Sequence, residues 1–119
     1  MFTYSFEKLD AWQESRKLVK LIYQITKSLP DSEKFGLINQ MRRASISVSS
    51  NIAEGSGRAT LNDQKHFYRM AYSSLLEILN QLILASDLEY IGKEELGSCR
   101  SQIELCTRLT AALYSSRAH

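Results

Sequence analysis

The sequence predicts an all-α protein, an antiparallel up-down-up-down four-helix bundle that occupies residues 1–119 as a single domain. The 119 residues include one proline and five glycines, so few residues interrupt a helix. Apolar side chains recur at helical spacing in four segments that are joined by short connections. No segment has the alternating pattern of a strand, and a composition of 44% hydrophobic and 24% charged residues is typical of a globular protein.

The first helix is predicted over residues 6–28. Apolar residues within Leu9–Leu29 follow helical spacing, with polar and charged residues between them. Pro30 ends this helix, because the residue before a proline disfavours the helical conformation. Asp31 or Ser32 is then expected to cap the next helix.

The second helix is predicted over residues 33–53. Its seam alternates steps of three and four, the spacing of a packed bundle, through Ile38, Met41, Ser45, Val48 and Ile52. We expect the helix to end at Gly55–Gly57, where a glycine can adopt the left-handed cap conformation.

The third helix is predicted over residues 61–88, with Thr60 as its N-cap. It carries two apolar stripes: Phe67, Ala71, Ser74, Ile78, Leu82 and Ala85 form one, and Tyr68, Tyr72, Leu75, Leu76, Leu79 and Ile83 form the other. A helix that is apolar on two sides is buried on two sides. This helix is therefore expected either to be central or to be covered by another subunit.

The fourth helix is predicted over residues 93–116, after a turn at Ile91–Gly92. Its apolar stripe includes Cys99 and Cys106. Two helical turns separate these residues by about 10 Å, which is too far for a disulfide. We expect buried thiols in a protein from a reducing compartment.

Charge is unevenly distributed along the chain, although the formal net charge is only +2. Residues 34–69 contain six basic and two acidic residues, a net charge of +4, whereas residues 70–99 contain one basic and five acidic residues, a net charge of −4. One region is therefore expected to form an electropositive surface.

The sequence also predicts the compartment. The N-terminus lacks a basic start followed by an apolar run, and the longest weakly charged segment, residues 71–86, is too short to span a bilayer. We expect a cytoplasmic protein that does not contact a membrane.

Polar residues are densest on the second helix and in the loop after it: Gln40, Arg42, Arg43, Ser47, Ser50, Asn51, Glu54 and Arg58. Most of those on the helix share a face that lies away from the apolar seam, and Arg42 lies between the two faces. Two interpretations stay open, a solvated or hydrogen-bonded structural face and a surface that contacts phosphates or a partner protein. The planar guanidinium of arginine suits phosphate because it can bond two oxygens.

Two further features lie on the third helix. Lys65 and Arg69 flank the aromatic residues Phe67 and Tyr68, a pattern that can bind single-stranded nucleic acid or can simply be solvated charges beside core aromatics. Glu77 is the only charge in residues 71–86. We favour an ion pair between Glu77 and an arginine of the second helix over exposure at a gap between subunits.

The sequence predicts no catalytic residue, no metal site and no cofactor. His66 follows Asp63 by three positions, but a di-metal bundle site needs paired motifs, and the only other histidine is His119. No nucleophile–base pair is recognisable, so we do not expect an enzyme.

The motif at residues 40–55, QMRRASISVSSNIAEG, closely resembles the signature of the 23S rRNA-intervening sequence proteins, also called the four helix bundle protein family. Matching context is found across nearly the whole chain, at Phe6, Leu9, Trp12, Leu29, Pro30, Glu33, Phe35, Gly36, Leu37, Ala71, Ser74 and Glu77. The family is similar to the accessory variability determinant proteins of retroelements, which form basic pentameric barrels that bind nucleic acid and a reverse transcriptase.

The resemblance implies a homopentamer of antiparallel four-helix bundles. It also implies that Arg42, Arg43 and Arg58 contact RNA, and that Asn51, Glu54 and Glu77, together with Gln40, hold the bundle together as a polar network. Two functional hypotheses follow. The first is a homo-oligomer that binds RNA or a ribonucleoprotein through a basic face, to which Lys65 and Arg69 contribute. The alternative is a scaffold that docks a partner protein with little nucleic-acid contact.

Overall fold

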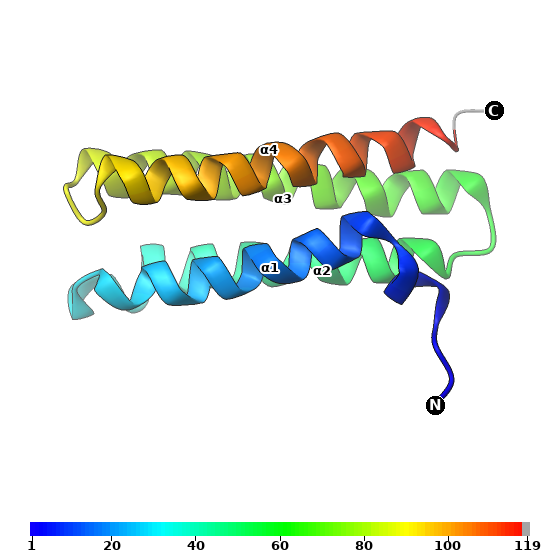
Figure 1. Ribbon diagram of the computed structural model, residues 1–119, viewed down its shortest axis with the longest axis horizontal. Coiled ribbons are helices and arrows are strands. Elements are labelled where there is room, and N and C mark those ends of the chain that lie inside the picture. The colour runs from blue at the N-terminus through cyan, green and yellow to red at the C-terminus, as the bar shows by residue number, and fades with distance from the viewer. Residues whose placement is uncertain (118–119) are drawn as a thin grey trace.

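A computed structural model describes residues 1–117 and confirms the all-α class and the antiparallel four-helix bundle (Figure 1). The helices are α1 (Asp10–Ile25), α2 (Leu37–Ser56), α3 (Leu61–Asp87) and α4 (Lys93–Ser115). Short 3-10 helices, η1 (Ser5–Lys8), η2 (Thr26–Ser28) and η3 (Asp31–Glu33), precede α1 and join it to α2. His119, which entered the metal-site argument, lies outside the described residues.

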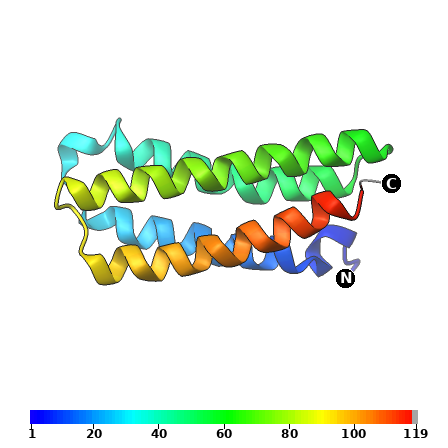
Figure 2. The ribbon, with the colours of Figure 1, turned by 90° about the horizontal axis from the view of Figure 1, so that it is seen from above.

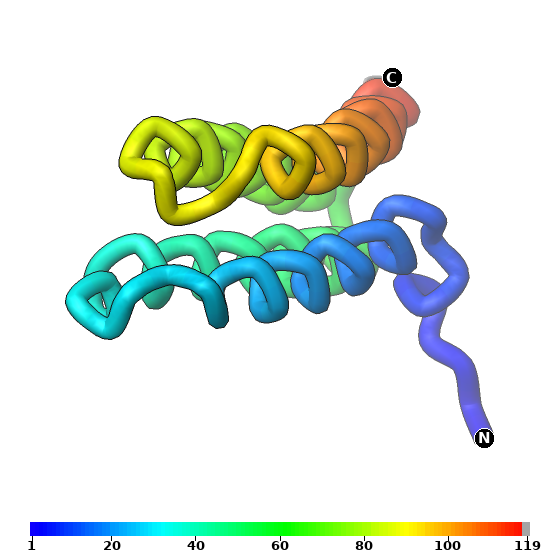
Figure 3. The backbone as a smooth tube through the Cα atoms, turned by 60° about the vertical axis from the view of Figure 1, so that its left-hand side comes forward, coloured from blue at the N-terminus to red at the C-terminus, as the bar shows by residue number. Residues whose placement is uncertain are grey.

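The four helices form two layers. Each helix packs against the next along the chain, and α4 also packs against α1, which closes the bundle. The pair α3 and α4 lies over the pair α1 and α2 (Figures 2 and 3). The N-terminal segment, the α2–α3 loop and the end of α4 therefore meet at one end of a molecule that measures 44 × 31 × 22 Å.

The core lies between the two layers, and it contains the seam predicted for α2. Met41, Val48 and Ile52 are fully buried there, opposite Ala71, Ile78 and Leu82 of α3. Thr60 caps α3 as expected, because its hydroxyl accepts a hydrogen bond from the backbone N–H of Asp63 at 3.1 Å.

The second apolar stripe of α3 is divided between core and surface. Tyr68 and Leu75 are fully buried, whereas Tyr72, Leu76 and Ile83 are 37%, 50% and 36% exposed. The division arises because only part of this side of α3 faces α4. Among residues 1–117 of one chain, part of the apolar surface of α3 therefore stays exposed.

The predicted left-handed glycine cap after α2 is wrong. The helix continues through Gly55 and ends at Ser56, and Gly57 follows in a right-handed conformation with φ −95°. Gly55 is needed instead for a close approach of helices. A Cβ at this position would lie 2.8 Å from Cε1 of Tyr68 and 3.0 Å from Cβ of Phe67, so α2 and α3 can meet here only without a side chain.

A left-handed cap does occur, but after α3. Glu89 has a positive φ of 64°. The N–H of Tyr90 donates a hydrogen bond to the carbonyl of Ala85, and the N–H of Glu89 donates one to the carbonyl of Ser86. This is a Schellman motif, and it turns the chain into the loop before α4.

The two cysteines are free and buried, as predicted. Burial, the largest cause, raises the pKa of the Cys106 thiol from an ordinary 9.0 to about 12. At pH 8 we expect neither thiol of the folded protein to react with an alkylating reagent such as iodoacetamide, because the thiolate is the nucleophile and burial raises the pKa of both. Both thiols should react after denaturation, and mass spectrometry before and after unfolding checks this.

The raised pKa of Cys106 also predicts how stability depends on pH. Burial of the neutral Cys106 thiol contributes in full to the free energy of unfolding below pH 9. This contribution is lost as the pH rises toward 12, because the thiol ionises more readily in the unfolded chain. An alkylated Cys106 in the folded protein at pH 8 would contradict the packing described for the core.

In the part of the chain that the structure describes, no helix combines the length and the apolar character that crossing a membrane requires.

Candidate nucleic-acid interface

Four cations lie toward the end of the bundle where the N-terminus, the α2–α3 loop and the end of α4 meet. We call them the basic cluster: Arg58, Lys65, Arg69 and Arg117. Arg58 lies in the α2–α3 loop, Lys65 and Arg69 lie in the N-terminal half of α3, and Arg117 follows α4. The fold therefore brings together three cations that the sequence singled out and one that it did not.

The cluster is held by aromatic rings. The guanidinium of Arg58 lies 4.3 Å from the centre of the Phe67 ring. The ammonium of Lys65 and the guanidinium of Arg69 lie 5.1 and 5.2 Å from the centre of the Tyr114 ring. A cation over an aromatic face is attracted by the ring quadrupole and keeps its full charge.

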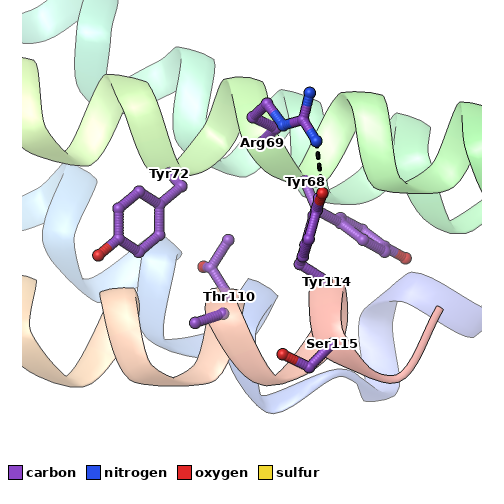
Figure 4. Close-up of a pocket in the computed structure, with 7 residues that line it drawn as sticks. Tyr68, Arg69, Tyr72, Thr110, Tyr114 and Ser115 are labelled. Carbon is purple, nitrogen blue, oxygen red and sulfur yellow. Dashed lines mark hydrogen bonds between the residues drawn. The ribbon is translucent and has the colours of Figure 1, made fainter. Parts of the chain in front are cut away.

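Arg69 also donates a hydrogen bond to the hydroxyl of Tyr114 (Figure 4). This bond, the largest cause, lowers the pKa of the Tyr114 hydroxyl below its ordinary value of 10.0. Tyr114 thus connects α4 to two cations of α3, and it orients both of them at the surface.

Arg117 completes the cluster. Its guanidinium lies 5.3 Å from the centre of the Tyr68 ring, and its Nε donates to Oε1 of Gln64 at 2.9 Å. Neither Arg117 nor Tyr114 was singled out from the sequence. No local pattern could have identified them, because Tyr114 meets Arg69 across 45 residues of chain.

No carboxylate forms an ion pair with the basic cluster within residues 1–117. The ion pairs in this part of the chain are Lys17–Glu14 and Arg100–Glu104, and both lie on other surfaces. Four cations that rest on aromatic rings and have no ion-pair partner within residues 1–117 thus lie toward one end of the bundle, a distribution of charge that favours the binding of an anion.

Arg42 has a structural position. Its Nε donates to Oγ1 of Thr26 at 2.9 Å, one of its terminal nitrogens donates to the carbonyl of Tyr23 at 3.3 Å, and its guanidinium stacks 4.6 Å from the centre of the Tyr23 ring. These contacts satisfy a carbonyl near the C-terminus of α1 and tie α2 to it. The structure thus separates Arg42 from the other arginines that the resemblance implied as RNA contacts.

Arg43 is exposed and lines a polar seam between α2 and α3, a groove of about 280 Å³. Within the seam, the amide of Asn51 donates to the carbonyl and the hydroxyl of Ser47 at 2.9 and 3.0 Å. The hydroxyl of Ser74 bonds that of Ser47 at 3.1 Å. This polar chain links the two helices outside the core.

A second polar link in the seam involves Gln81, which is 5% exposed. Its amide donates to Oε2 of Glu77 at 3.1 Å and to Oε1 of Gln40 at 3.4 Å. The expected ion pair between Glu77 and an arginine of α2 is not formed among the described residues. Glu77 is exposed, so water solvates its charge and no arginine is needed.

Glu54 differs from the other residues predicted for the polar network. It is exposed near the end of α2, and among residues 1–117 its carboxylate takes part in no side-chain hydrogen bond or ion pair. The structure thus brings together Gln40, Asn51 and Glu77 in the seam and leaves Glu54 in solvent.

Residues 1–117 contain no group of three or more histidine, cysteine, aspartate or glutamate side chains that could hold a metal ion.

The fold and the site define a four-helix bundle protein with a polar seam and an unneutralised basic end. The chain belongs to the 23S rRNA-intervening sequence protein family, whose model matches residues 7–112. Tyr114 and Arg117 lie beyond this match, so part of the basic cluster is formed outside the family's shared region.

A solved structure supports the fold. The crystal structure of a protein with unknown function from the S23 ribosomal protein family of Bacteroides thetaiotaomicron VPI-5482 is similar to this chain, with a TM-score of 0.81 and 22% sequence identity. The match covers 88% of this chain and 95% of that chain. No curated protein matches the chain.

Proposed function

We propose that this protein is a cytoplasmic, non-enzymatic homo-oligomer that binds structured RNA through its basic cluster. The observation that carries the proposal is the position of the cluster: its cations rest on aromatic rings and are not paired with carboxylates within residues 1–117. Binding that depends on phosphates recognises shape and charge more than sequence.

We assign the RNA contact to a different set of residues from the one that the resemblance implied. Arg58, Lys65, Arg69 and Arg117 form the main surface, and exposed Arg43 in the seam adds a second contact point. Arg42 is assigned to stability, because it donates hydrogen bonds to Tyr23 of α1 and Thr26 of η2. These contacts leave fewer of its five N–H donors for a phosphate.

The proposal is tested by titrating the purified oligomer with a hairpin RNA at several salt concentrations. A logarithm of the affinity that falls linearly with the logarithm of the salt concentration supports a surface that contacts phosphates. No binding at low salt, together with a 260/280 nm absorbance ratio typical of clean protein, would sink the RNA assignment. The scaffold that docks a partner protein would then be the better hypothesis.

Assembly is supported by an apolar patch on the C-terminal half of α3. We define the outer patch as Leu76, Ile83, Leu84 and Leu88, which are 36–54% exposed. Leu76 and Ile83 lie two helical turns apart, and Leu84 and the C-cap residue Leu88 follow about a quarter turn further around the helix. Exposed apolar patches are frequent at protein–protein contacts, so the outer patch supports assembly, and the family resemblance implies a pentamer.

Replacing Leu76 and Ile83 together with lysine is expected to convert the oligomer to smaller species, because charged side chains would have to be buried at the subunit contact. Light scattering at micromolar concentration measures the change. Ile46→Lys is the matched control, since Ile46 is 44% exposed on α2, outside the patch. A wild-type protein that is already monomeric would contradict self-assembly and would leave the patch as a docking surface for another protein.

A further inference from the structure

A groove of about 390 Å³ lies between α3 and α4, next to the basic cluster. Tyr68, Arg69 and Tyr72 line it from α3, and Thr110 and Tyr114 line it from α4 (Figure 4). Its volume falls within the range of small-molecule sites, about 300–1,000 Å³. The groove is large enough to hold one planar ring.

Thr110 gives the groove a polar group that nothing satisfies. Its side chain is fully buried, and its Oγ1 has no hydrogen-bond partner among the described residues. In Figure 4, Thr110 lies between Tyr72 and Tyr114. Buried hydroxyls are nearly always hydrogen-bonded, so the Thr110 hydroxyl is available to a polar group that binds in the groove.

The walls and the rim of the groove have complementary chemistry. Tyr72, which is 37% exposed, and the half-buried Tyr114 supply aromatic faces from the two helices. Arg69 and Lys65 place positive charge beside Tyr114. Aromatic walls bind a planar base, and the cations at the rim bind an anion attached to it.

We propose that this groove holds one unpaired nucleotide of the bound RNA. The base stacks against Tyr72 and Tyr114, the edge of the base bonds the Thr110 hydroxyl, and the phosphate lies on Arg69 and Lys65. This inference rests on the proposed RNA-binding function and adds a preference for unpaired over paired nucleotides.

Tyr114 is the neighbour of Thr110 in the lining of the groove. It lies one helical turn beyond Thr110 on the same side of α4, and the hydrogen bond from Arg69 fixes its ring. A phosphate that competes for the Arg69 guanidinium releases the Tyr114 hydroxyl. The ring is then free to turn toward the base, and because Thr110 is fully buried, a movement of this kind has to precede contact between its hydroxyl and the base.

The test uses the intact protein with three RNA probes: an adenylate decamer, a uridylate decamer and the duplex of the two. Thr110→Val keeps the shape of the side chain and removes the hydroxyl. Binding of at least one decamer is expected to weaken about tenfold, and duplex binding is expected to stay unchanged. The same variant should unfold at a higher temperature than the wild type, because it no longer buries an unpartnered polar group.

Thr107→Val is the matched control, since Thr107 lies on the same helix and its hydroxyl already donates to the carbonyl of Glu104 at 2.9 Å. This control should not alter decamer binding. Unchanged affinity of Thr110→Val for both decamers, with duplex binding intact, would overturn the nucleotide groove and leave the proposed function standing.

Other outcomes separate the sources of the ligand. No binding of any of the three probes would overturn the proposed function together with this inference. Free AMP or UMP bound as tightly as the decamers would overturn the assignment to RNA, because the ligand would then be a free nucleotide.

Discussion

Replacing Arg58, Lys65 and Arg69 together with glutamine is expected to weaken the binding of a hairpin RNA on the order of 100-fold at low salt. Each hydrogen bond to a charged group contributes about 1.5–3 kcal/mol, so the loss of even two contacts accounts for this change. The slope of log affinity against log salt should decrease by about 1 for each side chain that contacts a phosphate. Fluorescence anisotropy with a labelled hairpin at several salt concentrations measures both quantities.

A second triple variant tests whether RNA affinity depends on where the positive charges lie or only on the net charge of the protein. Lys20, Lys27 and Lys93 are exposed on α1, on η2 and at the start of α4, away from the basic cluster. Replacing these three with glutamine lowers the net charge by the same three units and is expected to change affinity and salt slope only slightly. Equal losses in the two variants would contradict a localised interface and would indicate attraction by net charge alone.

The basic cluster variant should remain folded. An exposed cation–π contact contributes about 0.5–1 kcal/mol, which is small beside the 5–15 kcal/mol that stabilises a typical domain. Thermal unfolding followed by circular dichroism checks this, and a folded variant with weak binding identifies the lost contacts as RNA contacts.

The helices and their buried seams could be predicted from sequence because both follow from local periodicity. Met41, Val48 and Ile52 recur at steps of three and four residues, and the spacing alone places them on one face. The apolar character of that face then requires it to be buried. The fold class and the order and approximate ends of the helices could therefore be predicted from this periodicity with few other signals.

The candidate site depends on contacts between distant residues, and these have no periodic signal. Lys65 and Arg69 were noted beside Phe67 and Tyr68, but the ring that holds both cations is that of Tyr114, on another helix. An ion pair with an arginine was predicted for Glu77, because the sequence does not show which side of an apolar helix faces water. Thr110 carried no signal, since an unsatisfied hydroxyl is a property of its surroundings.

The two halves of α3 carry different groups of surface residues. Its N-terminal half carries Lys65, Arg69 and Tyr72, and its C-terminal half carries the outer patch. The proposed RNA contacts would therefore lie at one end of a single helix and the proposed subunit contact at the other. In an oligomer joined through the patch, each subunit would add its own basic cluster, and the affinity for a long RNA would exceed that of one cluster.

Gly55→Ala is expected to lower the free energy of unfolding by up to about 2 kcal/mol, although alanine is the better helix former. The added Cβ would lie 2.8 Å from Cε1 of Tyr68 and 3.0 Å from Cβ of Phe67. Tyr68 is fully buried and cannot move aside freely. Overpacking of this kind costs about 1–3 kcal/mol, and the gain in helix propensity of about 1 kcal/mol offsets only part of it.

Gly97→Ala is expected to have the opposite effect on stability at an exposed helical glycine. Gly97 lies within α4, and a Cβ there would meet nothing within 4 Å, so alanine is expected to stabilise the protein by about 0.5–1 kcal/mol. Chemical unfolding of both variants at one protein concentration measures the two changes, since assembly makes stability depend on concentration. If Gly55→Ala were as stabilising as Gly97→Ala, the close approach of α2 and α3 at Tyr68 would be wrong, and with it the placement of the rings that support Arg58 and Arg117.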